Sequence, residues 1–118
     1  MMVFDERLGI LRDGNVISAE VESLVKRAIS RLEERWKIML TEEAGGRMVT
    51  HLAMALMRIK RHENIPAPET DVMNEFRGMD AFFLSETIVN DLIEWTPMEL
   101  PDSEKKYMIV NLCLLLDS

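Results

Sequence analysis

The sequence contains a single cysteine, Cys113, so no disulfide can form within one chain. It also lacks any apolar run approaching the roughly 18 residues of a membrane-spanning helix. Charged residues interrupt the first dozen positions, unlike a signal peptide. We therefore expect a cytoplasmic protein that does not enter a membrane. Cys113 lies in an apolar run, where we expect it to pack as a small hydrophobic residue.

Basic residues are fewer than acidic ones. The chain has 14 Lys and Arg and 21 Asp and Glu, which gives a net charge of -7. This balance repels a phosphate backbone, so we expect no direct contact with nucleic acid. Basic residues predominate between Ser18 and His62, and acidic residues predominate from Glu63 onward. The asymmetry indicates either a surface that steers a charged partner or helices with differently charged solvent faces.

Glycine and proline are infrequent, with five and four residues, so few positions interrupt regular structure. The apolar residues follow three- and four-residue spacings, without strand-like alternation, and predict an all-α fold. Ser18 is a suitable N-cap for a first helix that reaches about Met39. A break at Gly45-Gly46 precedes a second helix that continues to about His62.

Three further helices complete an expected set of five. The third begins at Thr70 and ends near Gly78, the fourth ends at Thr96-Pro97, and the fifth begins around Asp102. With 118 residues, of which 47% are hydrophobic and 30% charged, the chain has the composition of one packed domain. We interpret residues 1–17 as an N-terminal segment and residues 18–118 as that domain.

His51 is the candidate site residue with the clearest chemical interpretation. On the second predicted helix it falls at the margin between the apolar stripe and solvent. Arg47, Arg58 and His62 project along the same edge, where guanidinium groups could hold an anion beside a nucleophilic imidazole. The alternative is a histidine that packs at the core boundary with its nitrogens hydrogen-bonded.

Asn111 is a polar residue inside the most apolar segment, where an unpaired amide would be costly, so we expect it to form a hydrogen bond to a neighbouring helix. The two histidines do not form a known metal-ligand motif, and we expect neither a metal nor another cofactor. No nucleophile, base and oxyanion donors occur together. We therefore do not expect an enzyme.

Two segments carry a resemblance to a known family. Residues 46–59, GRMVTHLAMALMRI, and residues 100–112, LPDSEKKYMIVNL, resemble the phosphotransferase-system regulation domain, called the PRD. The resemblance extends over nearly the whole domain and is to the short, stand-alone members of the family. It implies a compact five-helix module that often forms homodimers, and the helix around Phe82 and Phe83 is a candidate contact.

The resemblance also implies a site. His51 occupies the position of a family histidine that accepts phosphate from the histidine phosphocarrier protein or a sugar-specific phosphotransferase component. Arg47 and Arg58 would support the phosphoryl group, and Asn111 would orient His51 if the two helices pack together. Asn111 stands where the family has a second histidine, and Thr50 stands where many relatives have an acidic residue.

Two functions remain in consideration. The first is a signalling module in which phosphorylation of His51 modulates transcription or a protein partner. The second is a constitutive helical interaction domain that is not phosphorylated.

Overall fold

Ser18 caps a helix as its sequence position predicts, because its Oγ accepts a hydrogen bond of 3.1 Å from the backbone N–H of Val21. The helix that follows, α2 (Ala19–Glu34), buries its apolar stripe. The computed structural model describes residues 4–117, and every helix or strand assigned in that range is an α-helix. The all-α class is therefore confirmed.

The described range contains six helices instead of the expected five. They are α1 (Asp5–Asp13), α2, α3 (Glu42–Lys60), α4 (Thr70–Arg77), α5 (Phe82–Trp95) and α6 (Asp102–Leu116). The last three agree closely with the predicted ranges, since Gly78 follows α4 and prolines lie between α5 and α6. The additional helix is α1, which has a single buried residue, Leu8, and therefore no apolar stripe for periodicity to detect.

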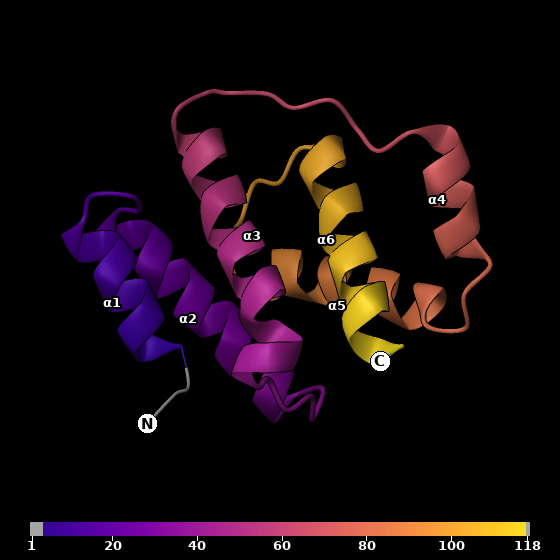
Figure 1. The fold of residues 1–118 in the computed structure, drawn as a ribbon, viewed down its shortest axis with the longest axis horizontal. Coiled ribbons are helices and arrows are strands. Elements are labelled where there is room, and N and C mark those ends of the chain that lie inside the picture. The colour runs from indigo at the N-terminus through magenta and orange to yellow at the C-terminus, as the bar shows by residue number, and fades with distance from the viewer. Residues whose placement is uncertain (1–3, 118) are drawn as a thin grey trace.

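Four helices enclose the core. Helix α3 lies between α2 and α6, and α5 packs along α6 and touches α2. Figure 1 shows α3 and α6 side by side and running in opposite directions, with α1 beside α2 at one end and α4 at the other. None of the helices described here is both long enough and apolar enough to span a membrane.

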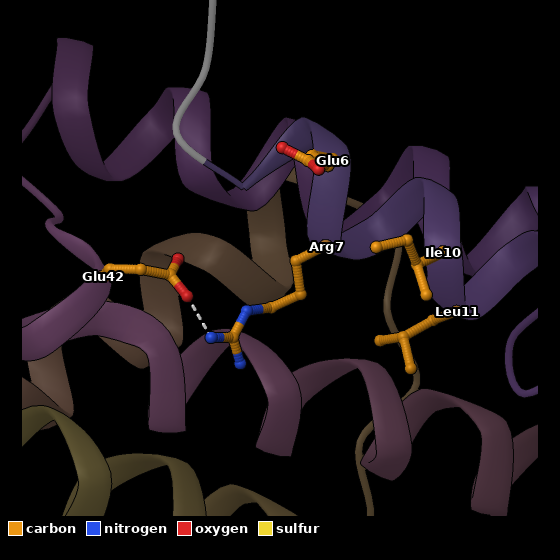
Figure 2. A pocket seen from close by; sticks show the side chains of 5 residues that line it. All are labelled: Glu6, Arg7, Ile10, Leu11 and Glu42. Atoms are coloured by element: carbon orange, nitrogen blue, oxygen red, sulfur yellow. Dashed lines mark hydrogen bonds and ion pairs between the residues drawn. The ribbon is translucent and has the colours of Figure 1, made fainter.

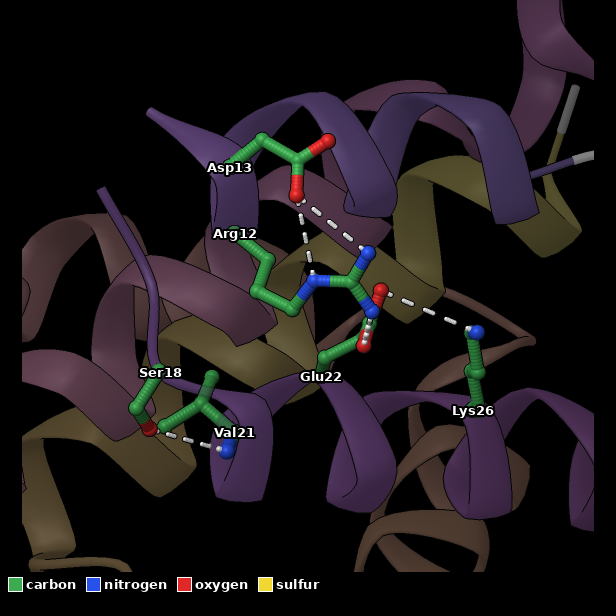
Figure 3. A network of polar contacts seen from close by, with 6 residues as sticks. All are labelled: Arg12, Asp13, Ser18, Val21, Glu22 and Lys26. Atoms are coloured by element: carbon green, nitrogen blue, oxygen red, sulfur yellow. Dashed lines mark hydrogen bonds and ion pairs between the residues drawn. The ribbon is translucent and has the colours of Figure 1, made fainter. Parts of the chain in front are cut away.

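Residues 4–17 of the N-terminal segment contribute to this core. Phe4 is 1% exposed, and Leu8 and Ile17 are also buried in the same cluster. A polar network holds α1 on α2 (Figure 3): Arg12 Nη1 donates to Glu22 Oε1 at 2.7 Å, and Lys26 Nζ lies 3.7 Å from Glu22 Oε2. Because Glu22 is buried, these two cations compensate its charge.

The expected break at Gly45-Gly46 is wrong, because both glycines lie inside α3. A Cβ added at Gly45 would lie 3.1 Å from side-chain atoms of Leu40 and 3.2 Å from Cζ of Phe4. Gly45 therefore allows the segments before α1 and before α3 to approach the helix closely. The pair reflects tertiary packing, although each glycine weakens the helix locally.

Two helix ends also differ from expectation, since α2 ends at Glu34 instead of Met39 and α3 at Lys60 instead of His62. After α2, Lys37 adopts a left-handed conformation with φ 56°. After α3, His62 has φ 60°, and the N–H of Glu63 donates to the carbonyl of Arg58. This is the Schellman arrangement, here without the glycine that usually marks it in a sequence.

Candidate functional site

His51 is exposed on α3, outside the face that packs into the core. Arg47 is one turn earlier on the same side and is also exposed. Within residues 4–117, neither side chain has a hydrogen bond or ion pair. The structure therefore presents an unpaired imidazole to solvent with an unpaired guanidinium on the adjacent turn.

Arg58 has a different partner. Its Nε and Nη2 atoms each donate to a carboxylate oxygen of Glu104 at 2.9 Å, which joins α3 to α6. Glu104 is 3% exposed, and its hydrogen bonds raise the pKa of Arg58 further above its usual value. Arg58 is two turns, roughly 10 Å, from His51. In this arrangement it binds Glu104 and is not available to an anion at His51.

Asn111 is buried on α6, and its Nδ2 donates to the carbonyl of Tyr107, one turn earlier in the same helix, at 2.9 Å. Since α3 and α6 are antiparallel, the Arg58–Glu104 pair sets their register. Counting seven residues from each member of that pair leads to His51 on α3 and to Asn111 on α6. The two residues therefore lie at the same level, although the hydrogen bond shown by Asn111 is within α6.

His62 does not share the edge of α3 with the other three residues. It follows the end of the helix, in the left-handed turn described above, and is exposed. Helical spacing alone predicted Arg47, Arg58 and His62 on one edge with His51. The structure brings only Arg47 next to His51.

Arg7 of α1 also reaches α3, and it was not among the site residues predicted from the sequence (Figure 2). Its Nη1 donates to Thr50 Oγ1 at 3.0 Å, and its Nη2 forms an ion pair with Glu42. Thr50 immediately precedes His51. Arg7 and Glu42 line an open groove of about 510 Å³ between α1 and α3. No local pattern could have indicated Arg7, because 43 residues separate it from Thr50.

A second polar cluster ties α2 to α5. Arg31 and the indole Nε1 of Trp36 donate to Asp91 at 2.9 Å, and these contacts, Arg31 first, hold the pKa of Asp91 below its usual value. The guanidinium groups of Arg27 and Arg31 lie 5.5 and 5.0 Å from the ring centre of Trp95. The charged and polar groups of this cluster pair with one another, so the cluster holds α2 against α5.

Other candidate chemistry is limited in the part of the chain that the structure describes. No three His, Cys, Asp or Glu side chains there are close enough to hold a metal ion. Cys113 is buried, and burial raises the pKa of its thiol above the ordinary value. It therefore packs as an unreactive hydrophobic residue, as its position in an apolar run predicts.

Comparisons with known proteins relate this chain to others of similar length. It is 24% identical over 108 residues to the "Uncharacterized protein YhfY" of Escherichia coli (strain K12), which covers 92% of this chain and 90% of that protein. It is 23% identical over 96 residues to an "Uncharacterized protein" of Haemophilus influenzae, with coverages of 81% and 77%. No solved structure matches the chain significantly.

The family model of the PRD domain matches residues 26–112. This range begins within α2 and includes His51, Arg58, Glu104 and Asn111, whereas α1 lies outside it. The match therefore covers most of the chain, all of α3 and most of α6. On this ground, the chain belongs to the PRD family.

Proposed function

We propose that this chain is a regulatory module that accepts a phosphoryl group on His51 from the histidine phosphocarrier protein or a sugar-specific phosphotransferase component. The phosphorylated and unphosphorylated forms would then differ in their effect on transcription or on a protein partner. One observation carries the proposal: within the family match, His51 presents an imidazole that is exposed and unpaired among the described residues. PRD domains are regulatory modules, which agrees with this role.

The transfer requires little from the acceptor. A neutral imidazole nitrogen of His51 attacks the phosphorus of a phosphohistidine on the donor. The phosphorus–nitrogen bond of the donor breaks as the new one forms, and the proton of His51 ends on the donor imidazole. The chain must therefore expose His51 and tolerate a new negative charge, for which Arg47 is the nearest cation on α3.

The position of His51 suggests how that charge becomes a signal. His51 is level with Asn111 on α6, and the buried Arg58–Glu104 pair fixes the same two helices two turns away. A phosphoryl group on His51 would lie beside the packed interface of α3 and α6. Its negative charge must there be hydrated or paired with a cation. Phosphorylation would therefore act on the packing of α3 against α6 or on a surface that these helices present.

Label transfer tests the acceptor residue. We expect a phosphocarrier relay with labelled donor to transfer label to the native chain and to His62→Asn, and transfer to His51→Gln to fall at least 100-fold. Asparagine suits position 62 because it tolerates the left-handed backbone there. Acid treatment should remove the label, since phosphohistidine is acid-labile, and any acid-stable label is counted separately.

Two results would oppose the proposal. Undiminished transfer to His51→Gln would assign the label elsewhere. Absence of transfer from a competent cognate donor would favour the constitutive interaction domain, an alternative supported by Asn111 at the second histidine position and by the commitment of Arg58 to Glu104.

The proposal includes pairing of two chains through the start of α5. Phe83 and Leu84 are 77% and 44% exposed, whereas the adjacent Phe82 packs against the core. We expect sedimentation at micromolar concentration to give about twice the 13.7 kDa mass of one chain. Phe83→Ser should return the mass toward that of one chain, while Met39→Ser, at another exposed apolar side chain, should not. A native mass of 13.7 kDa at every concentration would reject pairing.

A further inference from the structure

Arg7 connects α1 to the turn of α3 that carries His51. Gly46 has no side chain, and a Cβ added there would lie 3.5 Å from Nη2 of Arg7. The guanidinium group therefore rests directly against α3, where it donates to Thr50 Oγ1 at 3.0 Å. Phe4 and Leu8, buried on either side of Arg7 in sequence, hold α1 in the position that makes this contact possible.

The ion pair that Arg7 forms with Glu42 is exchangeable. The side chains of Arg7 and Glu42 are 39% and 52% exposed, so water screens their attraction and the pair contributes little to stability. Figure 2 shows Arg7 extending from α1 toward Glu42, and both side chains line the groove. A partner of higher negative charge on the same face would compete with the Glu42 carboxylate.

A phosphoryl group on His51 would be such a partner, because it lies on the surface of α3 near Arg7. Thr50 and His51 are about 100° apart around the helix axis, and Arg47 projects between them. Arg7 approaches from the Thr50 side, and Arg47 has no ion pair within residues 4–117. A phosphoryl group on His51 would therefore lie on a face bordered by two guanidinium groups, one of which comes from α1.

We propose that Arg7 binds the phosphoryl group on His51, together with Arg47, so that α1 responds to phosphorylation by docking more tightly on α3. This inference rests on the proposed function, because it concerns the same histidine. It adds a ligand from a helix that lies outside the region matched by the PRD family model. A charge-assisted contact to a dianion replaces a weak, exposed ion pair to a single carboxylate.

The test uses a small phosphoryl donor, phosphoramidate, on the full chain carrying His62→Asn, which leaves His51 as its only histidine. The His51 nitrogen attacks phosphorus, the phosphorus–nitrogen bond of phosphoramidate breaks, and the imidazole proton leaves with ammonia as ammonium. Amide hydrogen exchange is then measured for residues 5–13. We expect phosphorylation to slow exchange there by about 5-fold, as a solvent-exposed charge-assisted contact would.

Three variants separate the contribution of Arg7 from general effects. Arg7→Gln should abolish the change in exchange between the two forms, whatever its effect on the unphosphorylated protein. Glu42→Gln frees Arg7 without removing it, so the change should persist or increase. Arg77→Gln removes an exposed arginine from α4, far from α1, and should leave the 5-fold change intact.

The outcome that overturns the inference is an equal change in exchange in the Arg7→Gln and Arg77→Gln proteins, or faster exchange of α1 on phosphorylation. Because phosphoramidate needs no recognition by a protein, this result is independent of the relay experiment. Failure of relay transfer counts against the proposed function, whereas failure of the exchange response counts against Arg7 alone.

Discussion

Replacement of Arg58 with alanine is expected to lower the free energy of unfolding by about 3–5 kcal/mol, the usual cost of leaving a buried charge without its partner. Glu104 is 3% exposed and receives both of its short hydrogen bonds from Arg58. Without the guanidinium, the carboxylate must remain charged in the interface between α3 and α6 or take up a proton. Urea unfolding at neutral pH, followed by circular dichroism, measures the loss.

Two comparisons identify the cause of that loss. The double variant Arg58→Met/Glu104→Leu removes both charges and keeps apolar volume, so it should recover most of the stability lost by Arg58→Ala. Arg77→Ala removes an exposed arginine whose hydrogen bond within residues 4–117 is to the side chain of Asn74, and it should change stability by less than about 0.5 kcal/mol. If Arg58→Ala resembled Arg77→Ala, the buried pair would not hold the two helices together.

Replacement of Phe4 with alanine is expected to cost about 3 kcal/mol, within the usual range for removal of a buried aromatic ring. Phe4 is 1% exposed and packs beside Gly45, at the point where α1 meets α3. The loss should fall mainly on α1, because that helix has few other buried side chains. Hydrogen exchange of residues 5–13 should accelerate more than exchange in α6.

The matched control for Phe4, the N-cap residue of α1, is Ile10, which is 65% exposed on that helix. Ile10→Ala should change stability by less than about 0.5 kcal/mol. Uniform acceleration of exchange in α1 and α6 by Phe4→Ala would show that α1 unfolds only with the whole protein. Unchanged exchange in α1 would show that Phe4 does not hold it in place.

Some features of this fold depend on residues close together in sequence, and others depend on residues far apart. Only the first kind could be predicted from the sequence. The Ser18 cap, the prolines after α5 and the apolar spacing of α2 act within a few residues, so they indicated most helices correctly. Helix α1 depends on tertiary burial, and the glycines of α3 serve contacts with Leu40, Phe4 and Arg7. Local patterns misplaced both features.

The same distinction applies to the site. His51 was identified from its place on a helix and from a short motif, both of which are local. The partner of Arg58 is 46 residues away in sequence, and that of Arg7 is 43 residues away. Glu104 did stand in the motif that resembles the family, but its burial and its pairing with Arg58 became visible only once α3 and α6 were placed together.

The cluster between α2 and α5 has an optical consequence. Both tryptophans of the chain belong to it: Trp36 bonds to Asp91, and Trp95 lies beneath Arg27 and Arg31. Intrinsic fluorescence therefore reports on the junction of α2 with α5 and contains no emission from a tryptophan in α1. Detachment of α1 would reduce the helical dichroism while leaving tryptophan emission nearly constant, so the two signals together distinguish partial from complete unfolding.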